Sequence, residues 1–385
     1  MAGIYIHIPF CKQACHYCNF HFSVSLKNKL AFIDALLKEA EMRRNYFHDL
    51  PSPGCSTHIE TIYIGGGTPS LLHTSELIRI FERIRKVFPA GQVKEITLEA
   101  NPDDLTYEKL LSLRQSPINR LSIGVQSFHF PDLQFMNRSH SPVQAVQSIR
   151  NAQKIGFTNL TVDLIYGIPG MSDAMWEANL RQLIDMEIPH ISAYALTVEK
   201  KTVLEYMIRK GKVSAVNDEQ AARQFNIMCD ILEESGYAHY EISNFALPGY
   251  QSQHNVSYWT GVPYLGLGPS AHSYKPGNRY WNPANTSVYI ETMQKGIPFW
   301  EGEELTDADA CNEYVMTSLR TSWGCDLQKV YDEWGREFSD SLLRLAEKHI
   351  LSGKIMRKGK ILTLTREGKF FADGIAADLF IVAGR

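Results

Sequence analysis

The chain has few cysteines, no long apolar run and no excess of charge of either sign. Seven cysteines in 385 residues are few and odd in number, which argues against a disulfide framework. No apolar run approaches the roughly 18 residues that cross a bilayer, and no signal peptide precedes the first apolar segment. We therefore expect no transmembrane segment and a cytoplasmic location. The net charge of -3 gives no electrostatic reason to expect nucleic acid as a partner.

Three of the cysteines stand close together after the first apolar segment. Cys11, Cys15 and Cys18 form a C-x3-C-x2-C triplet. Cysteine-ligated iron-sulfur clusters normally use four protein sulfurs, so three thiolates on one loop suggest a four-iron cluster with one iron open to an exchangeable ligand. The other four cysteines are scattered, and we interpret them as small apolar residues: Cys55, Cys229, Cys311 and Cys325.

A zinc site is the alternative for the triplet. His16 or His21 could complete a Cys3His tetrahedron, which is an ordinary structural zinc site. Zinc sites more often pair C-x2-C with a second pair elsewhere, and the sequence has no second pair. The spacing therefore favours the cluster.

Short β-rich apolar runs alternate with longer helical patterns, which predicts a parallel α/β architecture. Six strands are expected at Gly3–Ile8, Thr61–Ile64, Glu95–Leu98, Arg120–Val125, Leu160–Ile165 and His190–Leu196. Helices are expected at Leu30–Tyr46, Ser75–Val87, Thr106–Arg114, Pro142–Ile155, Asp173–Met186 and Asp218–Glu234, with N-caps at Ser75, Asp173 and Asp218. Six βα units are two short of a closed eightfold barrel, so we expect an open (β/α)6 three-quarter barrel of the TIM type.

Polar and glycine-rich segments follow these strands one after another. They are the cysteine loop, Gly65–Pro69, Glu99–Pro102, Gln126–Ser127, Asp163 with Gly167–Gly170, and Ala193–Tyr194. Chemistry in barrels of this type gathers at the carboxyl ends of the strands. We therefore expect one site at that end.

The triplet and the Gly65–Pro69 run together resemble the radical S-adenosylmethionine (SAM) superfamily. The resemblance implies a [4Fe-4S] cluster whose open iron binds the amino and carboxylate groups of SAM, and which can cleave the sulfonium to a 5′-deoxyadenosyl radical. It also implies the open barrel. Five motifs are similar to those of the HemW heme chaperones, relatives of oxygen-independent coproporphyrinogen III oxidase: Ile4–Cys11, Gly65–Ser70, Ser122–Ser127, Asp163–Gly170 and His254–Trp259.

The resemblance assigns further residues to cofactor binding. Gly66, Gly67, Thr68 and Glu99 are expected to line the SAM site, where glycines let the backbone approach a ligand closely. Gln126, Arg138 and Asp163 match positions that contact SAM or a ligand on the substrate side, and Tyr5 is expected beside the cluster. Phe20 is also among the residues expected to bind the cofactors. Taken without the resemblance, the glycines are a plain turn, Glu99 an ion-pair partner, Arg138 part of a solvated loop and Tyr5 an ordinary strand aromatic.

Two function classes remain open, and Phe20 bears on the choice between them. The decarboxylating oxidase carries C-x3-C-x2-C-x-C, and Phe20 stands at the place of its fourth cysteine. Only two residues precede the first expected strand, whereas the oxidase has an N-terminal extension that helps to close its active site. Both differences favour a heme chaperone, with heme or porphyrin, a heme-acceptor protein and an electron donor for the cluster as partners. The alternative is a coproporphyrinogen III oxidase of porphyrin biosynthesis.

The segment 237–300 is expected to face the porphyrin, because its first part is dense in aromatic and small residues. His254, in the HNxxYW motif, is the expected ligand of heme iron. A packed loop that covers the open side of the barrel would explain the aromatics equally well, and a lone histidine is more often a hydrogen-bonded structural residue.

The composition changes at about residue 300. We expect a barrel at 1–236, the aromatic-rich connecting segment at 237–300 and a C-terminal domain at 301–385. Helices followed by a hairpin at Ile355–Lys358 and Ile361–Thr365, and a last helix at Glu367–Leu379, are typical of a winged-helix-like domain. Residues 301–385 carry 12 Lys and Arg against 15 Asp and Glu, which argues against DNA binding. We expect a lid or docking element for the barrel.

Overall fold

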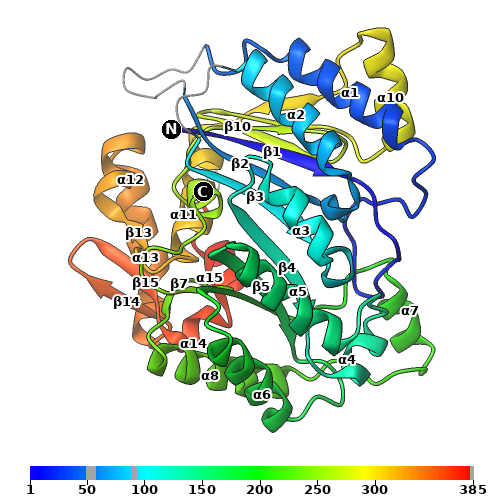
Figure 1. The fold of residues 1–385 in the computed structure, drawn as a ribbon. Helices are drawn as coiled ribbons and strands as arrows, with labels where there is room; N and C mark the ends of the chain where they lie inside the picture. The colour runs from blue at the N-terminus through cyan, green and yellow to red at the C-terminus, as the bar shows by residue number, and fades with distance from the viewer. Residues whose placement is uncertain (49–57, 89–92, 382–385) are drawn as a thin grey trace.

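A single sheet of 12 strands forms the centre of the protein in the computed structural model, which describes residues 1–48, 58–88 and 93–381 (Figure 1). All six predicted strands are present, and each is parallel to the next in sequence order. They are β1 (Ala2–Ile8), β2 (Ile59–Gly66), β3 (Glu95–Ala100), β4 (Arg120–Gln126), β5 (Asn159–Tyr166) and β6 (His190–Ala195). The prediction of a parallel α/β core is confirmed.

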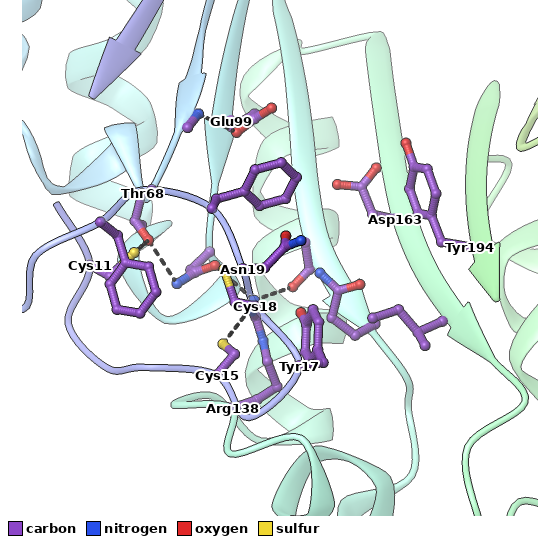
Figure 2. A pocket seen from close by; sticks show the side chains of 18 of the residues that line it. Cys11, Cys15, Tyr17, Cys18, Asn19, Thr68, Glu99, Arg138, Asp163 and Tyr194 are labelled. Atoms are coloured by element: carbon purple, nitrogen blue, oxygen red, sulfur yellow. Dashed lines mark hydrogen bonds between the residues drawn. The ribbon is translucent and has the colours of Figure 1, made fainter. Parts of the chain in front are cut away.

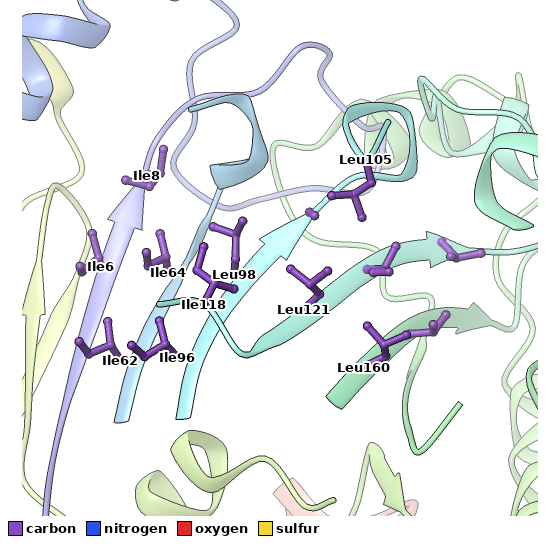
Figure 3. Close-up of a cluster of buried hydrophobic side chains, with 14 of the residues drawn as sticks. Ile6, Ile8, Ile62, Ile64, Ile96, Leu98, Leu105, Ile118, Leu121 and Leu160 are labelled. Carbon is purple, nitrogen blue, oxygen red and sulfur yellow. The ribbon is translucent and has the colours of Figure 1, made fainter. Parts of the chain in front are cut away.

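The two faces of these strands differ in polarity, because side chains alternate along a strand with a period of two. One face is apolar and packs against the helices. Figure 3 shows part of this layer, which includes Ile6, Ile8, Ile62, Ile64, Ile96, Leu98, Leu121 and Leu160, each at most 6% exposed. The residues between them point to the concave face and are mostly polar, such as Tyr63, Glu99, Ser122, Asp163 and Ser192. Alternation thus places the polar side chains inside the barrel.

The helices between the strands lie where the sequence predicted them. They are α1 (Lys29–Met42), α2 (Thr74–Val87), α3 (Tyr107–Arg114), α5 (Pro142–Ile155), α6 (Asp173–Asp185) and α8 (Asp218–Glu234). Shorter elements that the sequence did not predict are η1 (Pro69–Leu71), η2 (Pro102–Asp104), α4 (Phe130–Phe135) and α7 (Val203–Arg209).

The predicted N-caps are each displaced by one or two residues. The Ser172 hydroxyl accepts a hydrogen bond from the Met175 amide, and the Asn217 side chain accepts one from the Gln220 amide. The N-cap of α2 is His73 rather than Ser75. Asp173 and Asp218 instead stand in the first turn, where a negative charge is stabilised by the helix dipole.

Residues 237–300, together with the first residues of the segment 301–385, extend the sheet at both of its sides. β9 (Tyr264–Leu267) pairs in parallel with β1 and is followed by the antiparallel strands β10 (His272–Lys275), β11 (Asn278–Trp281) and β12 (Glu301–Glu304). On the other side, β8 (Asn244–Ala246) pairs with β6, and β7 (Ala238–Glu241) pairs with β8. Two helices, α9 (Gln253–Trp259) and α10 (Thr286–Lys295), complete this segment. β12 and β7 are the two edges of the sheet, and in the part of the chain that the structure describes no hydrogen bonds pair them, so the barrel is open.

The C-terminal residues form a second hydrophobic core around α11 (Asp307–Leu319), α12 (Leu327–Trp334) and α13 (Arg336–Leu351). A small antiparallel sheet has the order β13 (Cys325–Asp326), β15 (Ile361–Leu364) and β14 (Ile355–Lys358). The predicted last helix is divided into α14 (Arg366–Lys369) and α15 (Ala372–Asp378). The division arises because the Phe371 amide donates to the carbonyl of Gly368, three residues back, and so tightens the turn.

The C-terminal helices lie near the amino ends of the central strands, whereas the loop after β1 runs at the opposite end of the sheet (Figure 1). No helix of the described residues is long and apolar enough to cross a membrane.

Candidate functional site

A cavity of about 530 Å³ opens at the carboxyl ends of the parallel strands. All three cysteines of the triplet line it, and Figure 2 shows them at one side, with Asp163 and Tyr194 at the other. Most of the predicted cofactor-binding residues line the same cavity: Phe20, Gly66, Gly67, Thr68, Glu99, Gln126, Arg138 and Asp163. Residues as far apart in the chain as Cys11 and Glu199 therefore form one site.

Two polar side chains from other loops contact the thiols. The Thr68 hydroxyl donates to Cys11 Sγ at 3.5 Å, and Arg138 Nη1 donates to Cys15 Sγ at 3.3 Å. Burial is the main cause that raises the pKa of the Cys11 thiol to about 11, and the neighbouring thiols raise it further. Without a metal the Cys11 thiol thus stays protonated at neutral pH, whereas a bound cation would favour its thiolate.

Arg138 connects the cysteine loop to two strands. Its Nη2 donates to Asn101 Oδ1 and to the carbonyl of Gly124, each at 2.7 Å. The side chain is half-buried and held by these hydrogen bonds, so it is not part of a solvated loop, and its positive charge lies beside a thiol. It can offset part of the negative charge of three thiolates.

The glycine turn after β2 lies directly against the strand that leads to the cysteines. The Gly67 amide donates to the carbonyl of Ile8 at 2.8 Å, and the Thr68 amide donates to the carbonyl of Phe10 at 2.6 Å. A Cβ atom on Gly67 would lie 2.6 Å from the Phe10 oxygen and 2.9 Å from the Ile8 oxygen. The turn therefore needs glycine for close approach of two backbones, which is more than a plain turn requires.

Two carboxyl groups face the cavity, Glu99 from β3 and Asp163 from β5, which lie on either side of β4. Glu99 accepts hydrogen bonds from the Tyr63 hydroxyl at 2.8 Å and the Gly66 amide at 3.1 Å, and Asp163 accepts from the Ser122 hydroxyl at 3.3 Å. Burial raises the pKa of Glu99 to about 7 despite the bond from Tyr63, and repulsion by Asp163 adds to the shift. Burial likewise raises the pKa of Asp163 to about 6. A cationic ligand would stabilise the ionised form of both groups.

The raised pKa of Glu99 predicts how stability depends on pH. The folded protein binds the Glu99 proton more tightly than the unfolded chain does, so this stabilisation is complete below about pH 4.5 and is lost as the pH rises through about 7. In urea unfolding, Glu99→Gln protein should lose less stability than the unmodified protein between pH 4.5 and pH 8. The difference should be on the order of 2 kcal/mol, because one pKa unit corresponds to about 1.4 kcal/mol and cavity water weakens the effect.

Glu234→Gln, at an exposed position of α8, is the matched control for this experiment. It should follow the unmodified protein at every pH. An equal loss in Glu99→Gln and unmodified protein would contradict the proposed shift at Glu99.

Gln126 has a backbone conformation that was not visible in the sequence. Its φ is 68°, in the left-handed region that residues other than glycine seldom adopt. Such strain persists only where surrounding structure enforces it, and it occurs often at functional sites. Here it ends β4 and turns the Gln126 side chain into the cavity wall.

Tyr5 and His254 are not among the residues that line this cavity. The Tyr5 hydroxyl contacts His7 Nδ1 at 3.1 Å, and its ring stacks on Tyr63. His254 is 1% exposed, and its two ring nitrogens contact Thr61 Oγ1 and Tyr258 Oη, each at 2.8 Å. An axial bond from His254 to heme iron would therefore require the loss of one of these hydrogen bonds.

The histidines of the zinc alternative already have hydrogen-bond partners. His16 Nδ1 donates to the carbonyl of Phe135 at 2.8 Å, and His21 Nε2 contacts Thr286 Oγ1 at 2.8 Å. Of the scattered cysteines, Cys229, Cys311 and Cys325 are buried with free thiols, whereas Cys55 lies outside the described residues. Tyr17 and Ser122 also line the cavity, and neither was among the predicted cofactor-binding residues, although Ser122 begins the motif Ser122–Ser127.

Comparisons with known proteins agree with this geometry. The sequence model of the radical SAM superfamily matches residues 5–183, and that of the HemN C-terminal domain matches residues 305–371. "Heme chaperone HemW" of Bacillus subtilis is 34% identical over 97% of this chain and 98% of its own. "Heme chaperone HemW" of Mycobacterium tuberculosis is 32% identical over 98% of this chain and 94% of its own.

The fold resembles a solved structure described as coproporphyrinogen III oxidase (HemN) from Escherichia coli, a radical SAM enzyme. The TM-score is 0.83 at 24% identity, and the match covers 98% of this chain and 90% of that one. The open barrel and the C-terminal domain are thus a known arrangement.

Proposed function

We propose, since this chain belongs to the radical SAM superfamily and to its HemW branch, that the protein binds heme, a [4Fe-4S] cluster and SAM and passes heme to an acceptor protein. The observation that carries the proposal is the single cavity lined by Cys11, Cys15 and Cys18 together with the glycine turn and two carboxyl groups. The relatives' names supply the heme part of the proposal.

The residues present fit a cluster. Three thiols on one loop line one cavity, and the half-buried guanidinium of Arg138 lies next to one of them. A reduced cluster of this kind would supply an electron to the sulfonium of SAM. Thr68 and Arg138 would donate hydrogen bonds to the ligating sulfurs, which adjusts the reduction potential of a cluster.

The residues also fit a cationic ligand such as SAM. Glu99 and Asp163 are carboxyl groups whose pKa is raised by burial, so a positive charge nearby would stabilise their ionised forms. The turn at Gly66 and Gly67 packs against His7 and the backbone of residues 8 to 10 with no room for a Cβ atom, which holds the backbone of the turn at the cavity wall. In this proposal Glu99 and the turn orient SAM, and Asp163 lies toward its other end.

The second candidate is an oxidase that decarboxylates coproporphyrinogen III, and the likeness to HemN in fold is the observation that favours it. Phe20 argues against it. The ring is 69% exposed at the cavity rim and offers no metal ligand where the oxidase motif has its fourth cysteine. We therefore place the heme chaperone first.

Heme titration and a decarboxylation assay on one anaerobically reconstituted preparation separate the two candidates. We expect saturable heme absorbance, transfer of that heme to an apoprotein, and no conversion of coproporphyrinogen III with SAM and reductant. The E. coli oxidase assayed in parallel is the positive control. Formation of protoporphyrinogen would favour the oxidase, and absence of heme binding would refute the chaperone.

A further inference from the structure

We infer that the porphyrin ring lies in a second cavity, between the barrel segment and the C-terminal domain. The inference rests on the proposed heme binding and adds the place where heme is held. This cavity measures about 520 Å³, within the range of sites for organic ligands of this size. It shares no lining residue with the cavity of the cysteine loop, and it lies toward the amino ends of the central strands.

Aromatic side chains from both domains form its walls. Tyr258, Trp259, Tyr264 and Tyr274 come from α9 and from the added strands β9 and β10, and Tyr314 and Trp334 come from α11 and α12. A flat ring is recognised by apolar contact on both of its faces. Two walls of aromatic side chains on opposite domains provide such contact.

The rings on each side already form ordered pairs. The ring centroids of Tyr258 and Tyr264 are 4.5 Å apart at 75°, and those of Tyr264 and Tyr274 are 6.3 Å apart at 29°. Across the cavity the Tyr314 and Trp334 centroids are 5.7 Å apart. Mutual packing holds these side chains in place before a ligand binds, which lowers the entropy cost of binding.

Charged side chains stand at the rim of the cavity, as a porphyrin with two carboxylates requires. Arg279 forms an ion pair with Glu313, and Lys329 Nζ lies 3.7 Å from Glu333 Oε1. All four are partly exposed, so the cations can exchange a glutamate for a ligand carboxylate at low cost. The apolar ring would lie inside and the carboxylates at the rim.

The lining residues of this cavity include neither cysteine nor histidine among the described part of the chain. Recognition therefore depends on the ring rather than on the metal. His254 lies behind the wall, where its Nε2 is 2.8 Å from the Tyr258 hydroxyl. It acts as a positioning residue for Tyr258 in this arrangement.

Titrations with heme and with metal-free protoporphyrin IX test the inference. Both should bind the unmodified protein with Kd values within about threefold of each other, and SAM should not displace either. Met316→Glu adds a carboxylate to the cavity wall at a position on α11 that is 38% exposed. The variant should bind heme and protoporphyrin IX about tenfold more weakly, and its unfolding temperature should not fall, since glutamate is a good helix former. Trp334→Ala should also weaken the binding of both porphyrins.

Two variants outside the cavity are matched controls. Met356→Glu changes an exposed methionine on β14, and Tyr331→Ala changes an exposed aromatic on α12. Both should bind like the unmodified protein. Three results would overturn this site and leave the chaperone proposal standing. They are unchanged porphyrin binding by Met316→Glu protein, displacement of heme by SAM, and a protein that binds heme but not protoporphyrin IX. Failure of the unmodified protein to bind heme would instead refute the chaperone proposal.

Discussion

Cys15→Ala protein, reconstituted without oxygen, is expected to contain no intact [4Fe-4S] cluster and to lose the broad visible absorption of the unmodified protein. The reason is the small number of thiols at the site. Cys11, Cys15 and Cys18 are the cysteines that line the cavity, and the other described cysteines are buried elsewhere, so no other thiol of the described residues can replace the lost one. The loss should be nearly complete, because two thiolates do not hold such a cluster.

Iron and sulfide analysis and the absorption spectrum measure this effect. Cys311→Ala is the matched control, since that thiol lies in the C-terminal core and its removal should leave iron content unchanged. Full iron and sulfide in Cys15→Ala protein, or stoichiometric zinc in unmodified protein purified without oxygen, would contradict the assignment.

Gly67→Ala protein should lose the response of its cluster to SAM. The new Cβ would meet backbone atoms of Phe10 and Ile8, which cannot rotate away, so the turn must separate from the strand that leads to Cys11. Overpacking of this kind costs about 1–3 kcal/mol. In the unmodified protein, SAM should change the electron paramagnetic resonance signal of the reduced cluster, and in the variant this change should be absent or much weaker.

Gly374→Ala provides the comparison for this variant. Gly374 lies in α15, and an added Cβ would meet no atom within 4 Å. Alanine there should be neutral or should stabilise the helix by up to about 1 kcal/mol, with the SAM response unchanged. A normal SAM response in Gly67→Ala protein would show that the turn does not contact SAM.

The central strands and helices could be predicted because the signal is local. β4 is buried at every position, and its apolar residues alternate with polar ones that face the barrel interior. This alternation can be recognised in the sequence. β9 could not be found in this way. Its place beside β1 depends on pairing between residues about 260 positions apart, and the four residues Tyr264–Leu267 carry no periodic signal.

The site was predicted as far as consecutive motifs could show it. Because polar loops follow the strands one after another, Thr68, Glu99 and Asp163 were expected at one end of the barrel. All three line the same cavity. Motif similarity could not show that His254 lines neither of the two cavities, because that depends on Thr61 and Tyr258 as its partners. The second cavity requires two domains to meet, and no single stretch of sequence contains it.

The last strand of the large sheet has a consequence for self-association. An unpaired edge offers amide and carbonyl groups to any other strand, and proteins commonly protect such edges with charge. β12 at one edge reads Glu301-Gly302-Glu303-Glu304, and all four residues are exposed. A second copy that added its own β12 edge to edge would place six carboxylates along one seam. Repulsion there should keep the open barrel from growing into a continuous intermolecular sheet at neutral pH, and acidic solutions should weaken this protection.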